Sequence, residues 1–383
     1  MSAPGRSPSA GTNSSVRTLF PRWMVEVSPV VNERRTFHEA FWRGEGPSLI
    51  LVPAGDVPLY DTTNYAARFH NPAKMWGREM ERARPVIDWP TDGIPTVRPN
   101  LGTIFVPALA GQKYLVRDDQ MPWIQAPLSR EAIVNARRRA LAEAEVMERA
   151  EAFYRIHDAS GETGVIAYHP DTQGVFDIAH LLYGDDIFLD MMDPGAETWM
   201  DELLEICLDL VIRATCHIKR LLGEPDAAMV HGHATPQGVC FPDVGIRISE
   251  DTATLISPRS IERFVLPGIE KAAAPFGGAF LHYCGRHEAF FEMLCRMPCV
   301  RAIDLGNPEM YDTRWLMERC AATGTVLHSR LAAEPGERWE EYIRRLGRLV
   351  QETGARCILR PLVHPAGRGE CLEMKELWHD LTV

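Results

Sequence analysis

A histidine and a cysteine two residues apart, His282 and Cys284, are the residues of this chain whose types and spacing point most directly to chemistry. They close a short apolar run, 278–281, that predicts a buried strand, and residues two apart on a strand point to the same side. One imidazole and one thiolate would then lie close together, as a zinc site requires. The plain alternative is an apolar strand that carries the two residues by chance, so the surrounding sequence has to decide.

Apolar runs alternate along the chain with amphipathic stretches that predict helices. Strand followed by helix, about eight times, is the pattern of a (β/α)8 barrel, in which the carboxyl ends of the strands meet at one mouth and catalytic residues collect there. Polar residues follow most of these runs, which a purely structural barrel would not need. The expected strands are 48–52, 103–110, 163–168, 227–230, 278–284, 300–305, 325–328 and 357–359.

The bulk composition fits one large α/β domain. The chain has 383 residues, of which 45% are hydrophobic, enough for a sizeable core. Its formal net charge of −11 argues against a nucleic-acid partner, since a nucleic-acid surface would be basic. No apolar run reaches the roughly 18 residues that a membrane span needs, so no membrane partner is expected.

Residues 1–30 are expected to form a flexible N-terminal segment, followed by the barrel domain at 31–383. The first fifteen residues are rich in Ser, Gly and Pro and contain no hydrophobic signal core, which favours a cytoplasmic location. The nine cysteines are odd in number and lack disulfide-like spacing, so most are expected to be reduced.

Three segments resemble the uroporphyrinogen decarboxylase superfamily, which includes the zinc- and cobalamin-dependent methyltransferases. The second of them contains Asp251 and the third contains His282 and Cys284. The resemblance extends loosely from about residue 30 to the end of the chain. The three segments are 173–184, 243–267 and 277–285.

The superfamily contains two main chemistries, and the first expected strand separates them. The resemblance implies that a porphyrinogen decarboxylase would hold acidic substrate side chains with arginines near this strand. Val52 and Asp56 stand at those positions here, and they cannot hold several carboxylates. Uroporphyrinogen is therefore not expected to be a substrate, and the chain is more similar to the methyltransferase branch.

The methyltransferase branch implies a zinc ion and a corrinoid. Its His-x-Cys pair supplies two zinc ligands, and His282 and Cys284 match that pattern. The third ligand is normally a cysteine after the eighth strand, where this chain has His364 and, further along the loop, Cys371; both stay candidates. The implied reaction moves a methyl group between cobalamin, usually carried by a separate corrinoid protein, and a small thiol or methylated compound.

Other polar residues near the expected mouth are candidates for the same site. Asp251, His231 and His233 are the catalytic candidates; Asp251 has the alternative of a helix cap, and the histidines that of structural residues. Two further functions stay open, namely decarboxylation of a smaller carboxylated substrate and ligand binding by a metal-free barrel. The candidates for substrate binding are Gln173, Arg247, Asn307 and Arg330.

Overall fold

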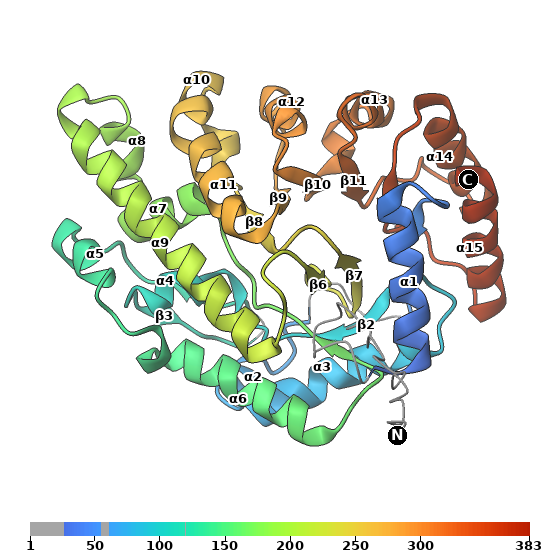
Figure 1. Cartoon of the computed structure of the whole chain (residues 1–383), viewed down its shortest axis with the longest axis horizontal. Coiled ribbons are helices and arrows are strands. Elements are labelled where there is room, and N and C mark those ends of the chain that lie inside the picture. The colour runs from blue at the N-terminus through green and yellow to red at the C-terminus, as the bar shows by residue number, and fades with distance from the viewer. Residues whose placement is uncertain (1–26, 55–60, 119) are drawn as a thin grey trace, which may run out of the picture.

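The computed structural model describes residues 27–54, 61–118 and 120–383, which form a mixed α/β fold. Most of the expected flexible segment lies outside these residues, as does Asp56. The first helix, α1 (Pro29–Arg43), begins two residues before the expected boundary at residue 31, because Ser28 caps it and Pro29 occupies its first turn. Helices surround strands that lie toward the middle (Figure 1).

The described strands form three sheets. Six strands make a parallel sheet in the order β1-β12-β11-β10-β9-β8. A second sheet has the order β5-β2-β7-β6, in which β2 is parallel to β5 and antiparallel to β7; β3 pairs with β4. The strands are β1 (Leu49–Ile50), β2 (Ile94–Val97), β3 (Tyr114–Leu115), β4 (Trp123–Ile124), β5 (Ile166–Ala167), β6 (Met229–His231), β7 (Gln237–Phe241), β8 (Ile246–Ser249), β9 (Ala279–Tyr283), β10 (Val300–Leu305), β11 (Val326–Ser329) and β12 (Cys357–Leu359).

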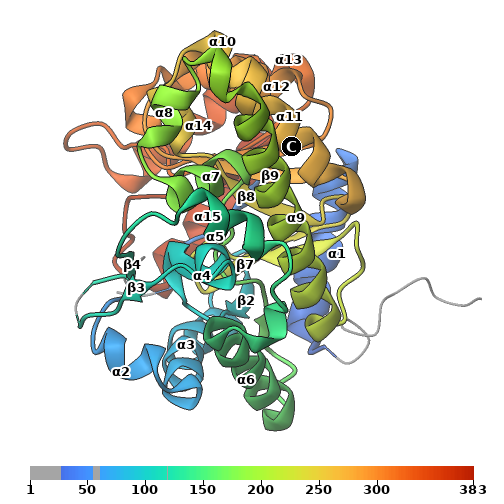
Figure 2. The same cartoon turned by 90° about the vertical axis from the view of Figure 1, so that its left-hand side faces the viewer.

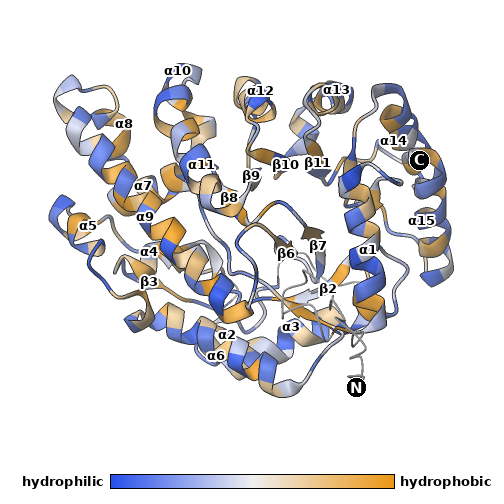
Figure 3. Cartoon of the chain, in the orientation of Figure 1, coloured by the Kyte–Doolittle hydropathy of each residue, from blue (hydrophilic) through white to orange (hydrophobic). Residues whose placement is uncertain are grey.

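The helices carry both hydrophobic and hydrophilic residues (Figure 3), and many of their hydrophobic residues belong to the main apolar core. Helices α10, α12 and α13 lie at one end of the molecule, and α2, α3 and α6 lie at the opposite end (Figure 2). No helix of the described residues has both the length and the apolar composition needed to cross a membrane. After α1, the helices are α2 (Tyr65–Phe69), α3 (Pro72–Ile87), α4 (Phe105–Leu109), α5 (Arg130–Ala136), α6 (Glu145–Ser160), α7 (Val175–Tyr183), α8 (Asp186–Asp190), α9 (Glu197–Leu222), α10 (Pro258–Ser260), α11 (Leu266–Ala273), α12 (Glu288–Arg296), α13 (Thr313–Thr323), α14 (Trp339–Thr353) and α15 (Arg368–Thr382).

Both edges of the six-stranded sheet contact segments that flank strands of the four-stranded sheet, the segment before β2 and the segment after β5. At one edge, Gln173 forms a parallel bridge with Ser249 of β8. At the other, the Asp92 N–H donates to the Ile50 carbonyl of β1 at 3.0 Å, and the Asp92 carboxylate accepts the Ile50 N–H at 2.8 Å. The two sheets are therefore joined at both sides, by a backbone bridge at one edge and by the backbone and carboxylate of Asp92 at the other.

Two of the expected strands differ from the structure. The run 103–110 is helical and contains α4. The expectation failed because residues 104–110 are all buried, and a short run that is apolar throughout has no periodicity that distinguishes a strand from a buried helix. The strand of this region is β2. The run 227–230 does contain a strand, but β6 pairs antiparallel with β7. The parallel neighbours of β9 are β10 and β8, and the apolar pattern of β8 is interrupted by Arg247.

The β6–β7 hairpin packs against one face of the parallel sheet. Its ring of Phe241 stacks on Phe280 of β9 with centroids 4.9 Å apart. Phe241 and Phe280 belong to a group of buried residues that we call the apolar layer. Its members are Met229, Val239, Phe241, Phe280, Ala302, Val326 and Ile358. Its residues come from the hairpin and from four neighbouring parallel strands, so the hairpin and the sheet fix each other's position.

Gly245, just before β8, tests this packing. A Cβ at Gly245 would lie 1.7 Å from the Asp226 carbonyl oxygen, which is backbone and cannot rotate away. We expect Gly245→Ala to lower the free energy of unfolding by about 3 kcal/mol, the upper range for overpacking. Gly77→Ala, inside α3 with no atom near the new methyl, should raise it by about 0.5–1 kcal/mol. Urea unfolding measures both, and equal effects would contradict the packing described.

Candidate functional site

Four adjacent parallel strands bring polar residues into one row. The register pairs Ser249 of β8 with His282 of β9, His282 with Asp304 of β10, and Asp304 with His328 of β11. On each strand, the residue two positions before the member of the row points to the same side of the sheet. Phe280, for example, lies on the same side as His282. The polar row therefore lies directly next to the apolar layer.

Asp304 is the centre of the row, and it is fully buried. Its Oδ2 lies 2.6 Å from His282 Nδ1 and 3.0 Å from His233 Nε2, and its Oδ1 lies 2.9 Å from His328 Nδ1. Arg360 Nη1 lies 3.8 Å from the same Oδ1. Burial alone would raise the pKa of Asp304, but the surrounding histidines outweigh it and hold that pKa well below its ordinary value. Asp304 is therefore an ionised carboxylate.

This carboxylate determines which imidazole nitrogens carry a proton. Because it can only accept, His282 and His328 each donate to it from Nδ1. Arg247 Nη2 donates to His233 Nδ1 at 2.9 Å, so the His233 proton is on Nε2 and points to Asp304. Burial lowers the pKa of both His233 and His328, so their rings are neutral at pH 7. The Nε2 of His282 then lies on the side away from Asp304, where it faces Cys284 and Asp251.

His282 Nε2 faces two further groups with ligand atoms. Cys284 Sγ lies 3.4 Å from it and Asp251 Oδ1 lies 3.8 Å from it, and the three atoms are all within 4.8 Å of one another. Nitrogen, sulfur and oxygen donors are a set that zinc accepts. A zinc-binding histidine is commonly oriented by a carboxylate on its other nitrogen, which is the position of Asp304. These residues therefore fit a zinc ion.

A second group of metal-binding residue types, His233, His282 and Asp304, lies beside the first. Its atoms are joined by hydrogen bonds of 2.6 and 3.0 Å. Since Asp304 already accepts from both imidazoles, we assign this group to the support of His282 and not to a second metal.

The loop after β9 holds the Cys284 thiol in place. Asp251 Oδ1 accepts the Cys284 N–H at 2.6 Å, and Asn307, expected to bind substrate, accepts the Gly285 N–H at 3.0 Å. A Cβ at Gly306 would lie 2.4 Å from Cys284 Sγ, so this position of the thiol requires a glycine there. Burial, with the charge of Asp251 next, raises the pKa of Cys284 to about 12. Without a metal, the thiol is protonated at pH 7.

The two histidines expected to be catalytic have different surroundings, although both are buried. His233 joins the network at Asp304, and it does so from a backbone with φ of +40°, followed by Ala234 at +65°. Positive φ values are uncommon for residues other than glycine, and strained backbone positions cluster at functional sites. His231 Nδ1 accepts the His233 N–H at 3.0 Å, so His231 supports this turn.

The remaining candidates for substrate binding border the network. Arg247 connects it to Asp171, whose Oδ1 lies 2.6 Å from Arg247 Nη1. Gln173 is buried next to β8. Arg330, at the end of β11, donates from Nη2 to the Gly306 carbonyl at 3.2 Å. Arg247, Gln173 and Arg330 thus lie around the row, while Asn307 holds the loop that carries Cys284.

Neither of the expected third ligands is part of the donor group around His282 and Cys284. His364 is exposed in the loop between β12 and α15, and Cys371 is buried within α15 as part of the main apolar core. Among the described residues, Asp251 completes the group. The distance between Asp251 and Cys284 depends on how the loop after β8 folds back, which spacing along the chain does not give.

Asp304 and His328 were expected among the polar residues at the strand ends, but sequence reasoning assigned neither of them a specific role, although both are central. Both stand at the ends of expected strands. Their residue types could have indicated the network. A carboxylate or an imidazole within an apolar strand needs a hydrogen-bond partner, and His282 on the neighbouring strand supplies one for Asp304.

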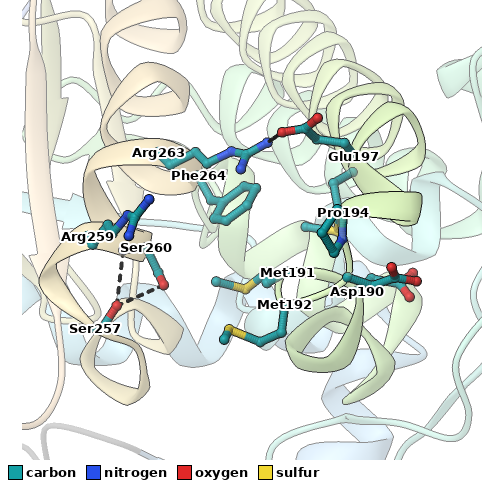
Figure 4. Close-up of a pocket in the computed structure, with 12 residues that line it drawn as sticks. Asp190, Met191, Met192, Pro194, Glu197, Ser257, Arg259, Ser260, Arg263 and Phe264 are labelled. Atoms are coloured by element: carbon teal, nitrogen blue, oxygen red, sulfur yellow. Dashed lines mark hydrogen bonds and ion pairs between the residues drawn. The ribbon is translucent and has the colours of Figure 1, made fainter.

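A separate hollow of about 360 Å³ lies between the start of α9 and the segment that includes α10 (Figure 4). Met191, Met192 and Phe264 line it, and an ion pair between Arg263 and Glu197 lies at its border. None of the candidate residues lines this hollow, so we assign it no part in the site.

Comparison with known proteins supports the fold. The chain matches no protein-family profile and no curated protein. It does match a solved structure described as a methyltransferase from Methanosarcina mazei, with a TM-score of 0.61 over 91% of this chain and 98% of that chain. The two sequences are 15% identical, so the match shows a shared fold, that of a methyltransferase-like α/β protein.

The Asp304 network predicts the effect of Asp304→Asn. Removing the charge from a buried set of hydrogen-bonded groups should lower the free energy of unfolding by about 3 kcal/mol at pH 7. Because the folded pKa is lowered, this difference should persist down to about pH 4, the ordinary pKa of an unfolded aspartate, and disappear as the pH falls through the folded value. Denaturant unfolding between pH 3 and 8 measures it.

Glu309→Gln is the matched control, since Glu309 is an exposed acid near the same site. It should change the stability by no more than about 0.5 kcal/mol. An Asp304→Asn protein as stable as the wild type would contradict the assignment of Asp304 as a charged centre.

Proposed function

We propose that the chain is a zinc-dependent methyltransferase that moves a methyl group between a corrinoid and a small thiol or methylated compound. The observation that carries the proposal is the group of His282 Nε2, Cys284 Sγ and Asp251 Oδ1, with Asp304 behind His282. Asp251 takes the place that we expected for His364 or Cys371.

The fold supports this proposal. The shared fold with a solved methyltransferase fits an enzyme of this class. We propose further that the two connected sheets are parts of one (β/α)8 barrel, since Gln173 and Asp92 join them at both edges. The site then lies at the carboxyl ends of the strands, where barrel enzymes carry their catalytic residues.

The residues of the site would have different roles in methyl transfer. Asp304 keeps the proton of His282 on Nδ1 and so keeps Nε2 available as a ligand. Cys284 is exposed and the side chain of Asp251 is 44% exposed, so the small-molecule partner can approach from their side, while His282 is buried. A zinc ion held there would act as a Lewis acid on the non-corrinoid partner and leave one position open to it.

The corrinoid part of the proposal rests on the resemblance of the three sequence segments to the methyltransferase branch. That resemblance also supports a separate corrinoid protein or free cobalamin as the partner. The polar residues near the site suit transfer in either direction.

A second candidate, decarboxylation of a small carboxylated substrate, is favoured by Arg98 and Arg247. Both are buried next to the site and both contact Asp171, so a substrate carboxylate could be held there. Release of carbon dioxide that does not depend on zinc would favour this candidate over methyl transfer.

We expect the purified protein to bind about one zinc ion per chain, because three convergent N, S and O donors match a zinc site. Cys284→Ser and Asp251→Asn should each lower the zinc affinity at least about tenfold, whereas His364→Ala and Cys371→Ser should not. Elemental analysis and competition with a chromogenic chelator measure this. Protein that takes up no zinc would contradict the site, and loss of zinc in His364→Ala would return that residue to the ligand set.

Methyl transfer is tested by the corrinoid spectrum. Methylcobalamin mixed with a panel of thiols, or cob(I)alamin mixed with methylated compounds, should show a protein-dependent spectral change. His282→Ala should slow it by about 100-fold or more, since a metal ligand acts on the reaction itself. The melting temperature should change far less, because the core is large and independent of this residue.

Glu309→Gln again serves as the control and should react like the wild type. If no pair of reactants gives a protein-dependent change, or if His282→Ala reacts as fast as the wild type, the methyltransferase proposal is wrong. Uroporphyrinogen, included as a substrate, should not be turned over.

A further inference from the structure

The loop after β8 has to place the Asp251 carboxylate beside Cys284. Asp251 directly precedes a short 3-10 helix, Thr252–Leu255, and its own side chain is 44% exposed. A single helical turn has little stability of its own, and an exposed side chain is not held in place by packing. Contacts from outside the loop must therefore fix the backbone at Asp251.

Asp177, in the first turn of α7, makes these contacts, and it is buried. Its Oδ2 accepts the Asp251 N–H at 2.9 Å, and its Oδ1 accepts the Thr252 N–H at 2.7 Å. The first N–H groups of a helix have no partner within that helix. The two oxygens of one carboxylate thus hold the two amides at which the 3-10 helix begins.

Glu250 makes the same kind of contact in the opposite direction, from the loop to α7. Its fully buried carboxylate accepts the Phe176 N–H at 3.3 Å and the Asp177 N–H at 3.0 Å, both at the start of the helix. A Cβ at Gly174 would lie 2.1 Å from Glu250 Oε1, so the glycine leaves room for this carboxylate. The start of α7 and the loop after β8 therefore fix each other.

Further hydrogen bonds extend this arrangement toward the thiol. His180 Nδ1, in the middle of α7, lies 3.1 Å from Thr252 Oγ1. Thr254 Oγ1 donates to the Asp251 carbonyl at 2.8 Å. The Asp251 carboxylate accepts the N–H of Cys284, the residue after β9 that carries the thiol. Hydrogen bonds thus connect α7, through the loop, to the group of metal-binding atoms.

The two buried carboxyl groups hold these places at a cost. Burial, with the charge of Asp251 next, raises the pKa of Asp177 to about 7. Burial, with the charge of Asp177 next, raises the pKa of Glu250 well above its ordinary value. Burial and a neighbouring like charge both disfavour the ionised form of an acid. Such a costly way to join a helix to a loop favours a role in placing Asp251 over a purely stabilising one.

We propose that Asp177 is a positioning residue for the metal group: it fixes the backbone of Asp251 so that the Asp251 carboxylate can serve as the third zinc ligand. The inference rests on the zinc site of the proposed function. The hold of Asp177 on the Asp251 backbone does not depend on a metal, so it can be measured separately.

The hold on the backbone is tested by hydrogen exchange in the chelator-treated full chain. Peptides that cover Asp251 and Thr252 should exchange slowly in the wild type and at least about tenfold faster in Asp177→Ala, because the hydrogen bonds that protect these amides are lost. Asp177→Asn, which keeps one acceptor oxygen, should have a smaller effect and serves if Asp177→Ala does not fold. Fast exchange in the wild type, or unchanged exchange in the folded variants, would overturn the proposal.

Zinc affinity, measured by competition with a chromogenic chelator, tests the positioning role. Asp177→Ala should weaken zinc binding by at least about tenfold, as expected when a group that orients a ligand is removed. Because Asp177 acts through Asp251, the double variant Asp177→Ala/Asp251→Ala should bind zinc no more weakly than Asp251→Ala alone. Additive losses in the double variant would show an independent structural effect and overturn the proposal.

Leu346→Ala controls for lost stability alone, since Leu346 is buried in α14 and belongs to the main apolar core. The cavity it leaves should lower the melting temperature. It should change neither the zinc affinity nor the exchange of the peptides that cover Asp251. An equal loss of zinc in Leu346→Ala and Asp177→Ala would overturn the positioning role.

The outcomes separate this inference from the proposed function. Wild-type zinc affinity in Asp177→Ala, with faster exchange at Asp251 and Thr252, would overturn the positioning role and leave the zinc site standing. A wild-type chain that takes up no zinc would contradict the proposed function, and the positioning role with it.

Discussion

The ionised carboxylate of Asp304 is the constraint on which the site depends. A charge with no exposure to water is tolerated only if donors surround it, and here three imidazoles and, at a longer distance, Arg360 do so. These donors come from β9, β11, the segment after β6 and the end of β12. The strand register, the turn at His233 and the tautomer of His282 must all be right at once, so the need to surround one carboxylate specifies the arrangement of the whole row.

The apolar layer beside the row makes these interactions stronger than they would be in water. Each polar residue follows a buried apolar residue on its strand: His282 follows Phe280, Asp304 follows Ala302 and His328 follows Val326. Buried apolar side chains therefore border the polar groups on one side. In such surroundings, hydrogen bonds between charged and polar groups gain strength, and unpaired groups become more costly. A continuous path of hydrogen bonds runs from Asp171 through Arg247 and His233 to Asp304 and His282. The ring of His282 is therefore linked to Arg247 through hydrogen-bonded groups alone.

The sequence predicted the local parts of this structure and missed the long-range ones. The pair of His282 and Cys284 on one side of a strand follows from the two-residue repeat of strands, and it was predicted. The α/β class and most strands followed from apolar runs in the same way, whereas residues 103–110 did not, because burial on all sides removes the periodicity that distinguishes helix from strand. The role of Asp251 beside Cys284 depends on a loop conformation, and that of Asp304 on the register of three strands, which no spacing along the chain encodes.

The pairing of β1 with β12 has a consequence for how the chain reaches this state. Leu49 is in register with Ile358, so β1 can pair within the parallel sheet only after β12, the last described strand, has been made. During synthesis, the N-terminal strand emerges long before its neighbour exists, and an unpaired strand edge is open to pairing with other chains. The β6–β7 hairpin joins residues close in sequence, and hairpin formation takes about 1–10 μs, but closing β1 onto β12 requires contacts far apart in sequence, which form slowly. Arg360 directly follows β12, so its contact with Asp304 can form only when this last described strand has joined the sheet.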